Sequence, residues 1–172
     1  MNKTPDVRSV DSFVFGNWKI KRYDVVLPIK IPANDVFIGI DPGTTNLGVC
    51  TIESSYATVF QIRMTRNSNP VERIIEARKI LNHIVKKGSV TNICVEGASF
   101  GDVYRQVELA EIRAACALWG IDRKAEVVIV PPSSIRKKVF GNGSINPKEI
   151  WKKYMVGDAA DALACAYYLI NF

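Results

Sequence analysis

The chain has 172 residues, of which 48% are hydrophobic and 23% are charged, a composition typical of a globular domain and not of a disordered chain. This length suits one domain that buries about two-thirds of its unfolded surface, and no apolar run approaches the roughly 20 residues that cross a bilayer. The N-terminus carries Asp6 and Asp11 and lacks the apolar segment of a signal or transit peptide. We therefore expect an intracellular, cytoplasmic protein.

The cysteines and the single histidine offer little for catalysis or metal binding. The cysteines lie in apolar segments without C-x-x-C spacing and are expected to be small core residues in a reducing compartment: Cys50, Cys94, Cys116 and Cys165. His83 lies in a helical pattern, where a lone histidine is usually structural. A zinc site or a Ser-His-Asp triad therefore has few candidates.

Residues 1–34 are predicted to be an N-terminal extension, and residues 35–172 the main domain. The extension is rich in β-prone residues and is interrupted by Pro28 and Pro32. Two short strands packed on the main domain are one interpretation, and an arm that binds a partner is the other.

The central stretch of the main domain is VFIGIDPGTTNLG at 36–48. Its apolar residues predict a buried strand, which Pro42 and Gly43 end directly after Asp41. Strand ends of α/β sheets are where reactive groups gather, because they are rigid and open to a crevice. Asp41 is therefore a candidate site residue, although an aspartate in an Asp-Pro-Gly sequence also commonly starts a turn.

The next elements are two strands, a helix and a further strand. Residues 47–52 and 58–64 are expected to form antiparallel hairpins with the first strand, because the connections are short. Apolar residues then recur at helical spacing over 71–85, and Lys86, Lys87 and Gly88 are expected to close that helix. A fourth strand over 90–95 ends at Glu96.

The last part of the chain alternates helices with one strand. A helix over 104–119 is followed by a strand over 126–130, a short basic helix from Ser133 or Ser134 to Phe140, and another from Asn146 or Pro147 to about Tyr154. The final helix covers 158–169. These elements predict an α/β fold with a five-stranded mixed sheet, its first three strands antiparallel, flanked by helices.

Four carboxylates stand at the ends of these elements. Asp41 ends the first central strand, Glu96 ends the fourth, and Asp158 and Asp161 share one face of the first turn of the last helix. Clustered carboxylates repel one another unless cations are bound, so an oxygen-only cluster implies Mg²⁺ or Mn²⁺. Two such ions about 4 Å apart can activate a water and stabilise the leaving oxygen of a phosphodiester.

Nearly all of the net charge of +6 lies in the window 133–153, where six basic residues face one acid. Such a patch is expected of a protein that binds the phosphate backbone of nucleic acid. A solvated helix face is the alternative. Together with the carboxylates, the window predicts a metal-dependent nuclease.

Four motifs belong to these segments: IDPGTTNLG at 40–48, VEGASFG at 95–101, PSSIRKKVFGNGSINPKEI at 132–150 and DAADALACAY at 158–167. Together they resemble the RuvC family of Holliday-junction resolvases, within the RNase H-like nuclease superfamily. The resemblance implies an RNase H-like fold and a Mg²⁺-dependent endonuclease, with Mn²⁺ as a substitute, that cuts branched DNA and resolves four-way junctions by paired nicks.

By motif position, the resemblance gives metal-binding catalytic roles to the four carboxylates, with two ions in each active site. DNA contacts are expected from six residues: Arg136, Lys137, Lys138, Lys148, Phe100 and Arg105. A homodimer is expected on the helix that contains Ala110 and Leu118, although its alanines could instead pack on the sheet of their own chain.

Other functions are weaker interpretations of the same sequence. The aromatic residue expected three places after Glu96 is Ser99, with Phe100 one place later, which leaves open a broader debranching nuclease of phage type. The IDPGTTNLG motif also resembles the phosphate loop of actin-like and chaperone ATPases, but these need two domains and a second phosphate loop. A non-catalytic module that binds branched DNA would tolerate loss of a carboxylate, whereas all four are present.

Overall fold

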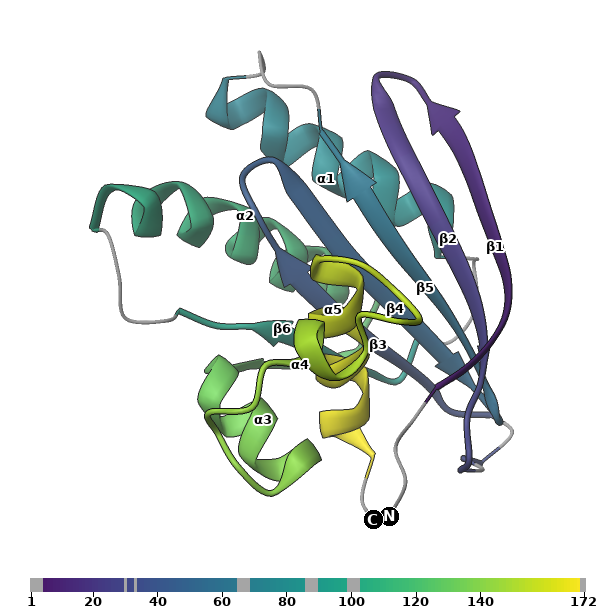
Figure 1. Cartoon of the computed structure of the whole chain (residues 1–172). Helices are drawn as coiled ribbons and strands as arrows, with labels where there is room; N and C mark the ends of the chain where they lie inside the picture. Colours follow the sequence, from purple (N-terminus) through teal and green to yellow (C-terminus); the bar gives the residue numbers. More distant parts are fainter. Residues whose placement is uncertain are drawn as a thin grey trace.

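The computed structural model describes residues 5–29, 31–32, 34–64, 69–85, 90–98 and 103–170, and its centre is one seven-stranded sheet (Figure 1). The strands are β1 (Asp6–Phe15), β2 (Trp18–Val26), β3 (Val36–Pro42), β4 (Asn46–Glu53), β5 (Tyr56–Arg63), β6 (Asn92–Glu96) and β7 (Glu126–Val130). The helices are α1 (Pro70–Ile84), α2 (Val103–Asp122), α3 (Pro132–Phe140), α4 (Pro147–Ile150) and α5 (Asp158–Leu169).

Strand pairing confirms the mixed sheet expected from the sequence. Across the sheet the order is β1-β2-β5-β4-β3-β6-β7. Strands β3, β4 and β5 form the predicted antiparallel hairpins, and β6 and β7 run parallel to β3. Because β3 and β6 are neighbours, the strands that end near Asp41 and Glu96 lie side by side.

The expected count of five strands is wrong, because the N-terminal residues add two more to the same sheet. Strand β2 pairs antiparallel with β5, from Lys19 opposite Arg63 to Val26 opposite Tyr56, and β1 pairs with β2. Trp18 and Tyr23 of β2 are both buried, each in a different core cluster. The hairpin therefore covers the edge of β5, which would otherwise expose unpaired backbone groups.

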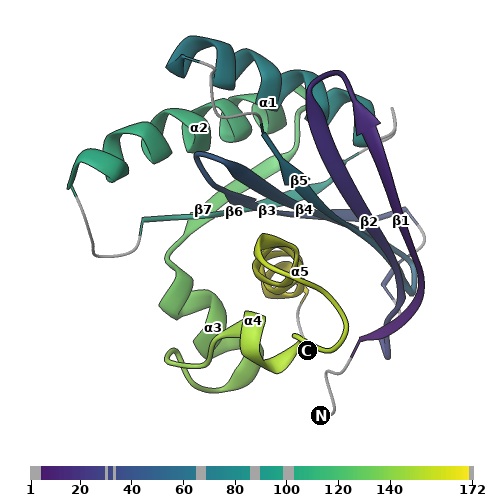
Figure 2. The same ribbon diagram turned by 45° about the horizontal axis from the view of Figure 1, so that its top comes forward.

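Helices cover both faces of the sheet (Figure 2). On one face α1 and α2 close a core around the apolar residues of β3, β4 and β5. On the other face α5 lies against the sheet, with α3 and α4 outside it. Every helix among the described residues is too short or too polar to cross a membrane.

Helix α5 approaches the sheet closely because small residues face each other. A Cβ atom added at Gly39 of β3 would overlap the backbone of Ala162 and Ala166, and one at Gly48 of β4 would overlap the backbone of Asp158. The helix is buried along most of its length, from Ala159 to Tyr167. This close packing places the first turn of α5 directly above the ends of β3 and β4.

The helix ends differ in detail from the sequence prediction. Helix α3 begins at Pro132 after Pro131, which makes no side-chain cap, so the predicted serine cap is wrong. Asn146 does cap α4, but that helix ends at Ile150 and continues only as turns. Residues 86–89, expected to close α1, lie outside the described residues.

We expect Gly39→Ala to destabilise the fold by about 3 kcal/mol or more, because the added methyl group must push α5 away from β3. Gly16→Ala is the control: its Cβ would meet open space, and only the positive φ of 57° opposes it, at a cost of about 1 kcal/mol. Urea unfolding measures both. Equal losses would contradict the close-packing interpretation.

Candidate active site

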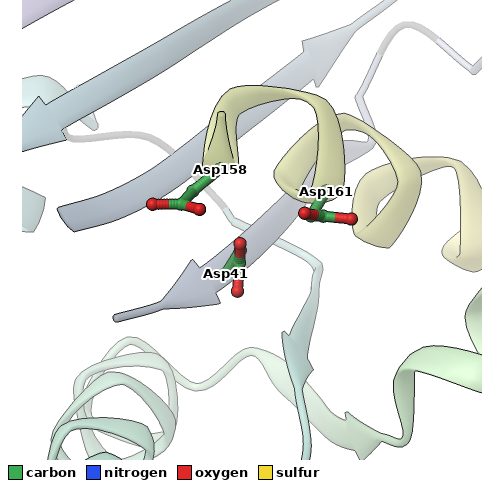
Figure 3. Close-up of side chains that lie close together, drawn as sticks. All are labelled: Asp41, Asp158 and Asp161. Atoms are coloured by element: carbon green, nitrogen blue, oxygen red, sulfur yellow. The ribbon is translucent and has the colours of Figure 1, made fainter. Parts of the chain in front are cut away.

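Three aspartates converge where β3 ends beneath the first turn of α5 (Figure 3). Asp41, Asp158 and Asp161 each offer one carboxylate oxygen, and these oxygens all lie within 4.8 Å of one another. Asp161 is buried and only 3% exposed. The strand end and the helix start thus bring together residues that are more than a hundred positions apart in the chain.

Glu96 completes the group from the neighbouring strand. Val95 pairs with Ile40, so Glu96 ends β6 beside Asp41, and both line a cavity of about 380 Å³ together with Asp158 and Asp161. Burial raises the pKa of Glu96 from 4.5 to about 7, with a further increase from the charge of Asp161 and an opposing effect of Arg136. The structure therefore gathers all four predicted carboxylates around one cavity.

The electrostatics of this cavity favour a bound cation. Burial raises the pKa of Asp41 well above its usual value, and the charges of Glu96 and Asp161 raise it further. Burial also raises the pKa of Asp161. Buried carboxylates that destabilise one another's charged forms, and that offer only hard oxygen atoms, are a donor set suited to Mg²⁺ or Mn²⁺.

Lys148 lies within the cluster, held there by the start of α4. Its Nζ donates a hydrogen bond to Asp158 Oδ1 at 2.8 Å and lies 3.0 Å from Asp161 Oδ2. Burial acts to lower the pKa of Lys148, but the hydrogen bond to Asp158 and the charge of Asp161 raise it above its usual value. The motif resemblance predicts only a DNA-binding role for this lysine, and its contact with the carboxylates is revealed by the structure alone.

A protein-family model matches residues 37–168, and its description is crossover junction endodeoxyribonuclease RuvC. The chain belongs to the RuvC family. Membership confirms the resemblance and the resolvase function expected from the motifs. No curated protein matches the chain closely enough to count as a relative.

Two solved RuvC structures from Thermus thermophilus share the fold. One is RuvC in complex with a Holliday junction substrate, with a TM-score of 0.59 and 16% identity over 77% of this chain and 90% of that one. The other is a Thermus thermophilus RuvC structure, with a TM-score of 0.57 and 17% identity over 77% of this chain and 92% of that one. This similarity confirms the predicted fold class.

The other predicted DNA contacts of this RuvC-family chain are spread around the site. Arg136 lines the cavity, with Nη2 3.9 Å from Asp161 Oδ1. Lys137 is exposed on α3, whereas Lys138 donates to the carbonyl oxygen of Tyr168 at 2.6 Å and lies over its ring. Phe100 and the side chain of Arg105 lie outside the described residues.

Gln61 of β5 is a positioning residue that the sequence did not reveal. Its Oε1 accepts a hydrogen bond from the backbone N–H of Ala159 at 2.8 Å, and its Nε2 donates to Asp158 Oδ2 at 3.3 Å. Helix α5 follows Gly157 and has no side-chain cap of its own, so Gln61 supplies one and orients Asp158 in the RuvC-family site.

Arg113 of α2 is a second residue in the cavity that was not predicted. Burial lowers its pKa, while the charges of Glu96 and Asp41 act in the opposite direction. A lone arginine in a helical pattern gives no signal in the sequence. Its position beside Glu96 follows from the packing of α2 along β6.

The raised pKa of Glu96 predicts how the stability of the metal-free protein depends on pH. Between about pH 4.5 and pH 7 the folded state binds more protons than the unfolded state, so stability should fall as pH rises through this range. We expect Glu96→Gln to remove the part of this fall in stability that comes from Glu96. The unfolding temperature in a metal chelator, measured from about pH 5 to about pH 8, shows the difference.

The exposed Glu53 at the end of β4 provides the control. Glu53→Gln should leave the pH dependence of the unfolding temperature as in the unmodified chain. A Glu96→Gln protein whose stability falls with pH as steeply as that of the unmodified chain would contradict the raised pKa.

Proposed function

We propose that this chain is a divalent-metal-dependent endonuclease that resolves four-way DNA junctions by paired nicks, with Asp41, Glu96, Asp158 and Asp161 as its catalytic, metal-binding residues. The observation that supports this most directly is the convergence of three carboxylate oxygens within 4.8 Å, with Glu96 lining the same cavity. Family membership supports the DNA junction as substrate.

The four carboxylates fit two Mg²⁺ ions, for which Mn²⁺ can substitute, because they offer only oxygen ligands in a largely buried, mutually repelling group. When bound, such ions supply an activated water and stabilise the leaving oxygen of a phosphodiester. Asp41 and Glu96 stand on rigid strand ends, and Gln61 fixes the orientation of Asp158. The chain therefore holds its acidic groups in place before substrate arrives.

Cationic groups around the carboxylates suit the phosphates of DNA. Arg136 and Lys148 lie in the cavity itself, and Lys137 and Lys138 extend the positive charge along α3. Phe100 and Arg105 remain predicted contacts. Because the proposed substrate is DNA, the site of action is intracellular. The four cysteines are free and buried, as predicted, which is typical of a protein in a reducing compartment.

We also propose a homodimer built on an apolar stripe of α2. Among the described side chains of the helix, one surface exposes five apolar residues at heptad-like spacing: Val107, Ala110, Ala114, Leu118 and Ile121. The opposite side, with Ala115, Cys116 and Trp119, is buried against the sheet of its own chain. Paired nicks require two active sites related by a two-fold axis, which a symmetric dimer supplies.

Replacing Asp41, Asp158 or Asp161 with Asn, or Glu96 with Gln, should lower junction cleavage by more than about a hundredfold, because each removes a charged ligand from the site. Binding to the junction should persist, since the carboxylates repel the phosphates. Cleavage is measured with Mg²⁺ on a four-way junction, a Y-fork and a linear duplex, and binding by gel shift. Paired, symmetric nicks on the four-way junction alone are the expected result.

The exposed Asp11 of β1 provides a matched control, and Asp11→Asn should cut at the rate of the unmodified chain. Equal cleavage of the Y-fork would favour the debranching nuclease. Cleavage by Asp158→Asn at the rate of the unmodified chain would remove this residue from the site.

Adjacent alanines on α2 test the dimer. Ala114 is exposed, so Ala114→Trp should yield a folded monomer, whereas Ala115 is 3% exposed and Ala115→Trp should destabilise the fold by about 1 to 3 kcal/mol through overpacking. Analytical sedimentation gives the oligomeric state and urea unfolding gives the stability. A monomeric unmodified protein that still makes paired nicks would refute the α2 dimer, unless DNA assembles the pair.

A further inference from the structure

The β1–β2 hairpin extends the sheet face on which the carboxylates stand. Asp41 pairs with Gly48, Gly48 with Gln61, and Gln61 with Lys21. Residues directly opposite each other in antiparallel strands have their side chains on the same face. One row therefore runs from the active site across β4 and β5 to Lys21 of the hairpin.

A second row runs beside the first, at the end of the sheet where β3 stops. Asn46 pairs with Arg63, and Arg63 pairs with Lys19. Arg63 and Lys19 are exposed, and Lys21 is half-buried with its Nζ 5.4 Å from the centre of the Tyr23 ring. We call the group of Lys19, Lys21 and Arg63 the hairpin strip.

The two faces of the hairpin differ in whether their positive charges form ion pairs. On the opposite face Arg22 donates hydrogen bonds to Asp24 at 2.8 and 3.0 Å, so the positive charge is balanced there. Within the described residues, no carboxylate forms an ion pair with any member of the hairpin strip. The face that carries the catalytic carboxylates thus continues into three unbalanced positive charges.

We propose that the hairpin strip binds the phosphate backbone of the duplex arm adjoining the cleavage site. The inference rests on the proposed function, since it takes branched DNA as the substrate. The hairpin precedes residue 37, where the family match begins, so two members of the strip, Lys19 and Lys21, lie outside the matched region. Cations that form no ion pair among the described residues, two of them exposed, are complementary to the regular negative charges of a duplex.

The spacing of the strands gives the position of the contact. Lys21 lies three strands from Asp41, which is about 14 Å at the usual separation of about 4.8 Å. Along a duplex that rises about 3.4 Å for each base pair, this distance corresponds to about four base pairs. The strip therefore contacts phosphates about four nucleotides from the cleaved bond and extends the protein–DNA contact along one duplex arm.

The test measures binding of a four-way junction by fluorescence anisotropy at several salt concentrations, in an Asp41→Asn background that prevents cleavage. Each lost phosphate contact lowers the slope of log affinity against log salt by about 0.9. The combined Lys19→Gln, Lys21→Gln, Arg63→Gln variant should therefore lose about 2.7 in slope and bind at least about tenfold more weakly at low salt.

Lys79 on α1 provides the matched control, because it is also an exposed lysine and lies on the helix that covers the other face of the sheet. Lys19→Gln alone should lower the slope by about 0.9, and Lys79→Gln should leave it unchanged. Thermal unfolding of each variant confirms that the fold is retained. Equal slopes for the combined variant and its parent would overturn the proposal.

A chemical change in the DNA locates the contact independently. Neutral methylphosphonate linkages about four nucleotides from the cleaved bond should weaken binding of the parent protein and leave the combined variant unaffected. Equal weakening of both proteins would place the contact elsewhere and refute the inference. If the parent protein bound no junction at all, the proposed function would fail, and the hairpin inference with it.

Discussion

The close packing of α5 on the sheet is the constraint on which the site depends. Glycines at positions 39 and 48 let the helix backbone rest against β3 and β4, and this contact sets the height of Asp158 and Asp161 above Asp41. Gln61 then fixes the first turn through the amide of Ala159. The geometry of the carboxylates thus comes from the backbone packing of α5 on β3 and β4, and the Gln61 side chain holds the first turn of the helix in place.

This packing has an electrostatic consequence. Burial and mutual repulsion raise the pKa values of Asp41, Glu96 and Asp161, so the cluster is unstable as a set of free charges. Lys148 and Arg136 offset part of the repulsion. A bound cation would lower the electrostatic repulsion among these carboxylates. The positive charges beside them suit the DNA that the family cuts.

Much of the fold could be predicted from local patterns. The strand over 126–130 and the helix over 158–169 have the predicted bounds, because a short apolar run and a helical repeat with an acidic first turn are local signals. The count of five strands was wrong because the sequence does not show which strand the β-prone residues before Pro28 pair with. Their partner, β5, lies about forty residues later, and only the folded sheet reveals the pairing.

The sequence by itself determined which carboxylates form the candidate site, since strand ends and a helix start are marked by residues close in the chain. It also determined the α/β class and the family motifs. Only the tertiary structure decided that Lys148 and Gln61 contact Asp158, that Ala114 faces outward while Ala115 is buried, and that Lys21 shares a face with Asp41. The reason is physical: helix and strand periods are set by neighbouring residues, whereas contacts between elements depend on register and packing across distant parts of the chain.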